Sequence, residues 1–224
     1  VSPAAFIPVA EQSGLILPLG RWVIEEGCRL WRHFAVQGLP PLPIALNVSA
    51  QQFLSIGFVE LVQATLRRYD VPPQMIELEI TEEATLGDPE MVTAILRALK
   101  ATGVTLAIDD FGTGYSSMAY LTSFPVDVLK IDQQFVRNLE TSARDASIVS
   151  MIVALAQELE FKIVAEGVET EYQANVLRGL GCDLMQGFLY SRPLPVVDYQ
   201  RFVEDSLSPE PAYRVDEAVG SFAR

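Results

Sequence analysis

Short apolar runs alternate along the chain with longer stretches in which hydrophobic residues recur every three or four positions. The apolar runs have the length of buried strands, and the periodic stretches have the spacing of amphipathic helices. The pattern predicts strands at 43–49, 75–81, 104–110, 127–132, 161–167 and 184–188. It predicts helices at 19–37, 58–69, 90–101, 143–160 and 171–179, with a shorter helical piece around 117–123.

The first residues of the chain predict one more short helix. Ser2 is a favourable N-cap residue, Pro3 suits the first helical position and Gly14 is a typical stop signal. This helix would therefore run between Ser2 and Gly14.

The order of these elements indicates the fold class. Strands that alternate with helices predict parallel βαβ units, and strands that are apolar on both faces are covered by helices or closed into a barrel. An open doubly wound sheet usually carries a glycine-rich phosphate loop after its first strand, and the chain contains neither GxGxxG nor GxxxxGK[ST]. We therefore expect an α/β fold of the TIM-barrel-like (β/α)8 type.

A barrel of this type sets the expected domain organisation. It needs eight strands, so the first two are expected upstream of Val1, in a longer polypeptide. The length of 224 residues suits a single domain. We expect that domain to cover 1–206, and a C-terminal tail to cover 207–224, where the sequence holds two prolines and no clear period.

Composition excludes several classes of function. The net charge of −13 would repel a polynucleotide backbone, so a phosphate ligand would need metal ions or a local cationic site. Cys28 and Cys182 have no metal-type spacing and suggest no disulfide framework, which fits a reducing cytoplasm. His33 is the only histidine and lies in an expected helix, which argues against histidine-ligated zinc and Ser/His triads. No apolar run approaches the roughly 18 residues that cross a bilayer, so we expect no membrane contact in this segment.

Oxygen-bearing side chains follow five of the expected strands. In parallel barrels the C-terminal strand ends converge on one mouth, where the chemistry collects. Carboxylate and amide oxygens are the ligands of Mg²⁺ and Mn²⁺, and two adjacent aspartates can serve two ions that activate water against a phosphodiester. The alternative is that each residue is only a turn former or the N-cap of the next helix. The residues are Asn47, Glu79, Asp109, Asp110, Asp132 and Glu166.

Two neighbouring features support a site at this mouth. Lys130 lies two residues before Asp132, so both point to one face of their strand, where Lys130 can pair with carboxylates or touch the attacking water. Gly112 and Gly114 flank Thr113 in a loop that permits close backbone approach to a ligand, although a lone GxG is a weak signal.

With these residues identified, the chain resembles the EAL-domain family of bacterial cyclic di-GMP phosphodiesterases. The resemblance runs from about Ser2 to Phe202. It rests on the segments SPAAFIPVAEQSGLI, LNVSAQQF, LEITEEA, IDDFGTGYSSMAYL, LKID, VAEGVET and GCDLMQGFLYSRPLP, which stand in the order usual for that family.

The resemblance implies a metal-dependent hydrolase with two Mg²⁺ or Mn²⁺ ions. It implies that Asn47, Glu79 and Asp109 ligate the first ion, and that Asp109 bridges to a second ion also held by Asp110. Glu166 would reach a metal or its water, and Lys130 and Asp132 would orient that water.

The resemblance also implies roles outside the metal pair. Gln186 and Glu169 would line the cyclic di-GMP site. Glu82 would anchor the loop that contains Phe111, Gly112, Thr113 and Gly114, and that loop would couple metal binding to a homodimer formed through the barrel.

One departure from the family pattern concerns the Glu-Ala-Leu tripeptide, which is expected upstream of Val1 together with a phosphate-binding arginine. We therefore expect little activity from residues 1–224 alone, although the parent protein would be an enzyme. The parent is expected in the cytoplasm or anchored to a membrane, behind sensory, receiver or diguanylate cyclase (GGDEF) domains. Two alternatives stay open: a catalytically silent cyclic di-GMP receptor and an unrelated metal-dependent barrel hydrolase.

Overall fold

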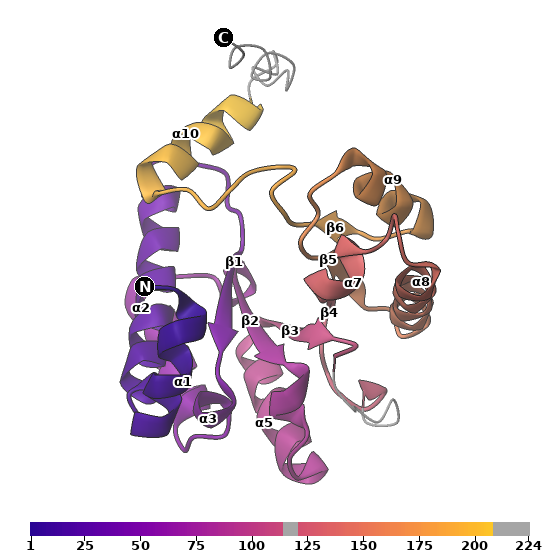
Figure 1. Ribbon diagram of the computed structural model, residues 1–224. Coiled ribbons are helices and arrows are strands. Elements are labelled where there is room, and N and C mark those ends of the chain that lie inside the picture. Colours follow the sequence, from indigo (N-terminus) through magenta and orange to yellow (C-terminus); the bar gives the residue numbers. More distant parts are fainter. Residues whose placement is uncertain (114–120, 208–224) are drawn as a thin grey trace.

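The computed structural model describes residues 1–113 and 121–207. Its centre is a parallel sheet of six strands in the order β1-β2-β3-β4-β5-β6, curled into a half-barrel (Figure 1). This confirms the expected TIM-barrel-like class. The strands are β1 (Ile44–Val48), β2 (Ile76–Thr81), β3 (Thr105–Phe111), β4 (Val128–Ile131), β5 (Lys162–Ala165) and β6 (Leu184–Met185).

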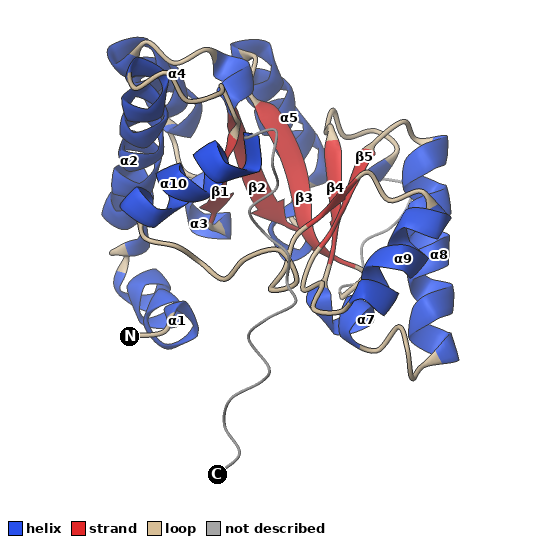
Figure 2. Ribbon diagram, turned by 90° about the horizontal axis from the view of Figure 1, so that it is seen from above, coloured by secondary structure: helices blue, strands red, loops and turns tan. Residues whose placement is uncertain are grey.

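Helices cover the outer side of the half-barrel. Figure 2 shows α2, α4 and α5 beside the first three strands, and α7, α8 and α9 beside the next two. The helices are α1 (Pro3–Ser13), α2 (Ile16–Val36), α3 (Ala50–Phe53), α4 (Phe58–Tyr69), α5 (Pro89–Thr102), α7 (Gln133–Arg137), α8 (Ala143–Glu158), α9 (Glu171–Leu180) and α10 (Val196–Leu207), with 3-10 turns η1 (Pro73–Met75) and η2 (Glu82–Thr85). Within the described residues, no helix has both the length and the apolar character needed to cross a membrane.

The two faces of the sheet differ in chemistry because successive side chains of a strand point to opposite sides. The side chains on the outer face are large and apolar, and they are buried against the helices. They include Leu78, Ile80, Ile108, Leu129 and Ile163. The inner face carries a small separate cluster of Ala107, Val128 and Val164, and in register with it lie polar residues. The apolar core therefore lies outside the half-barrel, and the polar groups collect inside.

Helix α2 approaches β1 closely through a glycine. A Cβ atom added at Gly27 would lie 2.8 Å from Cδ2 of Leu46, well inside a van der Waals contact. The absence of a side chain at Gly27 thus sets the distance between this helix and the first strand.

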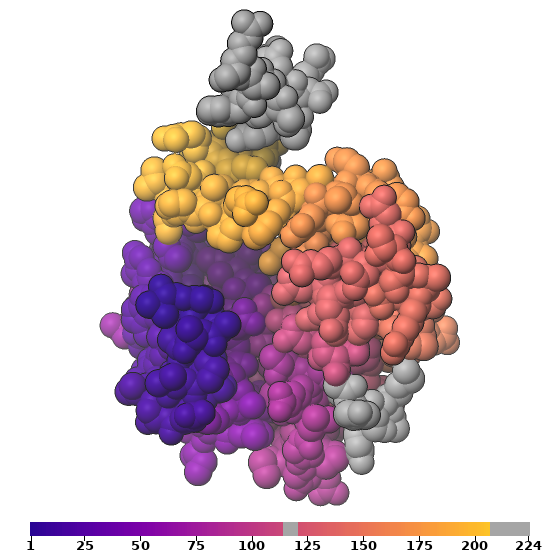
Figure 3. All heavy atoms as spheres, in the orientation of Figure 1, coloured from indigo at the N-terminus to yellow at the C-terminus, as the bar shows by residue number. Residues whose placement is uncertain are grey.

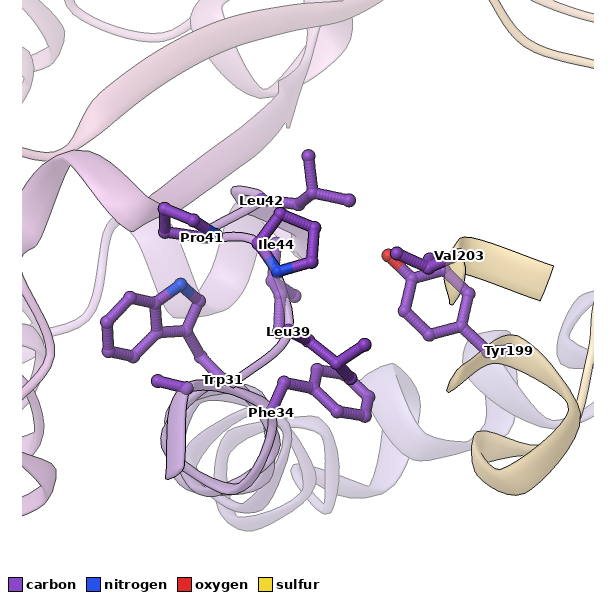
Figure 4. Close-up of a pocket in the computed structure, with 10 residues that line it drawn as sticks. Trp31, Phe34, Leu39, Pro41, Leu42, Ile44, Tyr199 and Val203 are labelled. Atoms are coloured by element: carbon purple, nitrogen blue, oxygen red, sulfur yellow. The ribbon is translucent and has the colours of Figure 1, made fainter. Parts of the chain in front are cut away.

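Helix α10 ties the end of the chain to the beginning. The segment after β6 crosses to α2, where α10 packs against its C-terminal end (Figure 1). Tyr199 and Phe34 lie with ring centroids 5.4 Å apart, and Tyr199 and Val203 face Phe34 and Leu39 across a small apolar pocket (Figure 4). Its volume of about 20 Å³ is little more than one water molecule needs, so this pocket is a packing seam.

The element boundaries deviate from the sequence expectations in a few places. Helix α1 has the expected bounds and ends at Gly14 in the left-handed conformation, but Ser2 makes no side-chain cap bond. Helix α2 starts at Ile16, before the expected residue 19. Helix α10 was not among the predicted helices. The helical piece around 117–123 lies mostly outside the described residues, as does the tail from residue 208.

The contact at Gly27 leads to a prediction about stability. Gly27→Val should lower the free energy of unfolding by about 1–3 kcal/mol, because the added carbons overlap Leu46. For a domain of this size, thermal unfolding should shift down by about 2–4 °C for each kcal/mol. Gly179→Ala in α9 is the matched control, since a Cβ there meets nothing within 4 Å. The control should stabilise the chain by about 0.5–1 kcal/mol, and equal melts for both variants would contradict the packing argument.

Candidate functional site

A bulge at the end of β3 brings two adjacent aspartates to one side of the sheet. The pairing of β3 with β4 shifts register between Ile108 and Phe111, so Asp109 and Asp110 stand opposite the single residue Lys130. Asp110 has φ of +54°, a left-handed conformation, and its N–H donates to Oδ1 of Asp109 at 2.9 Å. In a regular strand these neighbours would point to opposite faces, and a bulge re-aims one of them.

The aspartate pair meets a third carboxylate from the neighbouring strand. Asp109, Asp110 and Glu166 each present an oxygen, and these oxygens all lie within 4.8 Å of one another. Glu166 follows β5 directly, and its N–H donates to the carbonyl of Ile131 at 3.1 Å, which continues the ladder with β4. The sheet hydrogen bonds therefore fix the distance between Glu166 and the bulge.

Lys130 lies between the carboxylates and is almost fully buried, with 4% of its side chain exposed. Its Nζ lies 2.6 Å from Oε1 of Glu79, 3.3 Å from Oδ1 of Asp109 and 2.5 Å from Oε1 of Glu166. Burial by itself would lower the pKa of Lys130, but the charge of Glu79 and hydrogen bonds to Glu166 and Glu79 raise it above its ordinary value. Lys130 is thus a permanent ammonium at this site.

The site still carries an excess of negative charge. Burial raises the pKa of Glu79, and the shared charge of Lys130 opposes this only in part. Burial, a hydrogen bond with Asp132 and the charge of Asp109 raise the pKa of Asp110 to about 6. A site with these shifts favours an additional cation.

Asp132 and Asn47 lie at the margin of this cluster. The Asp132 side chain accepts from the N–H of Gln134 at 2.7 Å and so caps α7, the N-cap role that the sequence analysis considered as an alternative. Asp132 also forms a hydrogen bond with Asp110. Asn47 stands in register with Glu79 on the next strand, and its side chain is exposed. It lines a hollow of about 750 Å³ formed by the N-terminal helices and the ends of the first two strands. In Figure 3 the surface is depressed between the indigo N-terminal helices and the salmon to orange segment that contains α7–α9.

The loop after β3 is anchored by a hydrogen bond to the side chain of Glu82. Oε2 of Glu82, a buried residue at the start of η2, accepts from the N–H of Gly112 at 2.9 Å. Gly112 has φ of +97°, and a Cβ there would lie 2.9 Å from the ring of Phe135, so this position requires glycine. Thr113 hydroxyl donates to the carbonyl of Asp110 at 2.9 Å, and Phe111 is buried. Gly114 lies outside the described residues.

A pocket of about 180 Å³ lies on the other side of Glu166. It is lined by Gln133, Glu166, Gly167, Glu169, Gln186, Gly187 and Phe188. The two residues expected at the substrate, Glu169 and Gln186, therefore share a pocket wall with the carboxylate cluster. A backbone crossing creates this arrangement: a Cβ at Gly187 would lie 2.1 Å from the carbonyl oxygen of Val168, so only glycine fits there.

Two further polar residues of the site were not identified from the sequence. Glu77 lies two residues before Glu79 on the same face of β2, and burial and the charge of Glu79 raise its pKa. The alternation in IELEI was the available signal for it. Gln133 is the first residue of α7, and it lies close to Gly167. A Cβ atom added at Gly167 would lie 2.6 Å from the Cβ atom of Gln133. No sequence spacing indicates that contact.

Known proteins resemble this chain in sequence. The family model described as EAL domain matches residues 1–193. The chain is 47% identical over 195 residues to the bifunctional diguanylate cyclase/cyclic di-GMP phosphodiesterase MucR of Pseudomonas aeruginosa, which covers 87% of this chain and 28% of MucR. It is 40% identical over 201 residues to the signaling protein YkoW of Bacillus subtilis, covering 90% of this chain and 25% of YkoW. The chain thus spans about a quarter of the length of these curated relatives.

Solved structures resemble the chain as well. The PaMucR phosphodiesterase in complex with cyclic di-GMP has a TM-score of 0.86 at 46% identity, covering 89% of this chain and 81% of that one. The EAL enzyme Bd1971, with cAMP and cyclic di-GMP bound, has a TM-score of 0.86 at 30% identity, covering 91% of this chain and 56% of that one. Since the family model, the relatives and the fold agree over most of its length, this chain belongs to the EAL domain family.

Proposed function

We propose that this chain is a phosphodiesterase domain that hydrolyses cyclic di-GMP to linear pGpG with two Mg²⁺ or Mn²⁺ ions. The observation that carries the proposal is the convergence of Asp109, Asp110 and Glu166 within 4.8 Å beside the buried ammonium of Lys130. Its relatives' names support the substrate, because MucR is named a cyclic di-GMP phosphodiesterase.

The residues present fit divalent cations. The donors are carboxylate oxygens with an amide close by, the set that Mg²⁺ and Mn²⁺ prefer. The Lys130 ammonium already occupies a position among three of the carboxylates. Burial, the hydrogen bond with Asp132 and the charge of Asp109 together still raise the pKa of Asp110. Asn47, Glu79, Asp109, Asp110 and Glu166 would hold the ions. Bound there, the ions supply positive charge toward the phosphodiester oxygens and lower the pKa of the water that serves as nucleophile.

The chain's own residues divide the remaining work. Since its pKa is raised, Lys130 keeps its proton and acts as a hydrogen-bond donor and a fixed positive charge. The proton of the attacking water must then pass to a carboxylate, and the candidates are Glu166 in the cluster and Asp132 at its margin. Gln186 and Glu169 would bind the substrate in the adjoining pocket, which keeps the phosphodiester beside Glu166.

The length of the relatives bears on the setting in which this domain works. This chain matches about a quarter of MucR and YkoW, so we propose that it works as one module of a cytoplasm-facing signalling protein with an input domain such as a GGDEF domain. We further propose that two such modules pair through the barrel.

The first experiment tests hydrolysis itself. The full-length protein should convert cyclic di-GMP to pGpG, followed by chromatography, with Mg²⁺ or Mn²⁺ and not with EDTA. Asp109→Asn should lower turnover about 10²-fold or more and weaken Mn²⁺ binding, because the amide lacks the charge that holds the ions. Asp88→Asn is the control, since Asp88 only caps α5 and asparagine also accepts from the N–H of Glu90. If the protein binds cyclic di-GMP and does not hydrolyse it, the phosphodiesterase proposal is wrong and the chain is a cyclic di-GMP receptor.

The second experiment uses pH. The pKa of Asp110 is raised to about 6, so below that pH the carboxyl holds a proton that a cation must displace. Mn²⁺ affinity measured by calorimetry should therefore fall as pH is lowered, by about tenfold per unit below about 6. Asp110→Asn should bind Mn²⁺ more weakly at neutral pH and lose most of this dependence. The same slope in both proteins would assign the titration to another group.

The third experiment concerns the loop. Glu82→Gln should lower turnover about tenfold and weaken self-association together, because the neutral amide is a poorer acceptor for the N–H of Gly112. Glu83→Gln, at the exposed neighbouring residue, should change neither. Turnover and gel filtration that respond separately would show that Glu82 does not couple the loop to the dimer.

A further inference from the structure

Gln173 is a buried polar side chain behind the loop that carries Glu166, and the mechanism does not use it. It is the third residue of α9, and only 5% of it is exposed. A buried amide that lacks partners is destabilising, so such a side chain is normally hydrogen-bonded. The partners of this amide therefore indicate what it holds in place.

The side-chain carbonyl of Gln173 accepts two consecutive backbone N–H groups. Its Oε1 accepts from the N–H of Glu169 at 2.7 Å and from the N–H of Thr170 at 3.0 Å. Thr170 Oγ1 accepts in return from the N–H of Gln173 at 3.2 Å, which completes a capping box at the start of α9. A capping box needs only the bond to Thr170. The additional and shorter bond to Glu169 is therefore not explained by helix capping.

The side-chain nitrogen of Gln173 points to a second helix. Nε2 donates to the carbonyl of Arg137, the last residue of α7, at the long distance of 3.5 Å. At the other end of α7, Gln133 lies against Gly167. The loop between β5 and α9 is thus held at two places along α7, and Figure 2 shows α7 and α9 side by side.

The loop of residues 166–170 carries two carboxylates that are held in different ways. The N–H of Glu166 continues the sheet ladder, and its carboxylate lies 2.5 Å from Nζ of Lys130. Glu169 lies beyond the sheet and is exposed, and among the described residues its carboxylate has no hydrogen-bond or ion-pair partner. The place of this carboxylate therefore depends on its backbone, which is bonded to Gln173.

We propose that Gln173 is a positioning residue that fixes the backbone of Glu169, so that the Glu169 carboxylate stands at the wall of the pocket of about 180 Å³. The proposal rests on the proposed cyclic di-GMP phosphodiesterase function, in which Glu169 contacts the substrate. Loss of this anchor frees Glu169 and leaves Glu166 in the sheet ladder. It should therefore raise KM, while kcat and Mn²⁺ affinity stay nearly unchanged.

The test compares the full-length wild type with Gln173→Met and Gln173→Glu, by kinetics of cyclic di-GMP hydrolysis with Mg²⁺ and by calorimetry of Mn²⁺ binding. Methionine is about as long as glutamine but is only a weak acceptor, so KM should rise about tenfold. Glutamate keeps the acceptor oxygen and is a regular member of capping boxes, so KM should stay within about twofold of the wild-type value. Both variants lose the long bond to Arg137, so that bond does not distinguish them.

Ser142→Ala is the matched control for helix stability. Ser142 is the N-cap of α8, and its hydroxyl oxygen accepts from the N–H of Asp145 at 3.1 Å. Its loss should lower the melting temperature as Gln173→Met does, because each variant removes a helix cap, but KM should not change. Hydrogen exchange, followed by mass spectrometry, should become faster in the peptide that contains Glu169 in Gln173→Met and stay normal there in Ser142→Ala.

The outcomes separate this proposal from the function on which it rests. Equal KM values for the wild type and Gln173→Met overturn the positioning role and leave the phosphodiesterase intact. A rise in KM that Gln173→Glu does not prevent, or that Ser142→Ala shares, also overturns it, because neither result depends on the acceptor bond to Glu169. So does a fall in kcat or Mn²⁺ affinity with KM unchanged. A wild type that neither binds nor hydrolyses cyclic di-GMP removes the proposed function, and the positioning role falls with it.

Discussion

The ammonium of Lys130 is the interaction on which the inner face of the half-barrel depends. It bonds to Glu79 on β2, to Asp109 on β3 and to Glu166 after β5. Three carboxylates this close would repel one another in a poorly solvated site, and removing a partner from a buried ion pair costs about 3–5 kcal/mol. Lys130 therefore allows three strands to bring acidic groups together on the inner face of the sheet.

The two faces of the sheet separate stability from chemistry. Large apolar side chains on the outer face, such as Ile80 and Leu129, are buried by the helices and supply the hydrophobic stabilisation. The inner face contributes only a small apolar cluster and carries the charged groups. Because neighbouring residues of a strand face opposite sides, the same short segments serve both purposes, and this explains why runs such as LAIDD combine buried aliphatic residues with acids.

The sequence was sufficient for features that depend on local pattern. The six strands and the acidic residues at their ends follow from apolar runs and from the rule that parallel strand ends converge, which predicted the meeting of Asp109 with Glu166. The left-handed backbone at Asp110 was not predictable, because it arises from the register between β3 and β4. Helix α10 was missed because its stability comes from contacts with α2. The close approach of Gly187 to the backbone of Val168 was not predictable either, because the two segments are far apart in the sequence.

The backbone at Asp110 also limits which descendants of this sequence are open to evolution. Left-handed backbone is tolerated by glycine, asparagine and aspartate far more readily than by other residues. A lineage that abandons catalysis while keeping the fold is therefore free to exchange the carboxylate only within a narrow set at this position. At Asp109, which does not have a positive φ, no such restriction applies. The positions of Asp109 and Asp110 would then diverge at different rates. Asparagine or glycine at the position of Asp110 would be the expected replacement in relatives that have lost catalysis and kept binding.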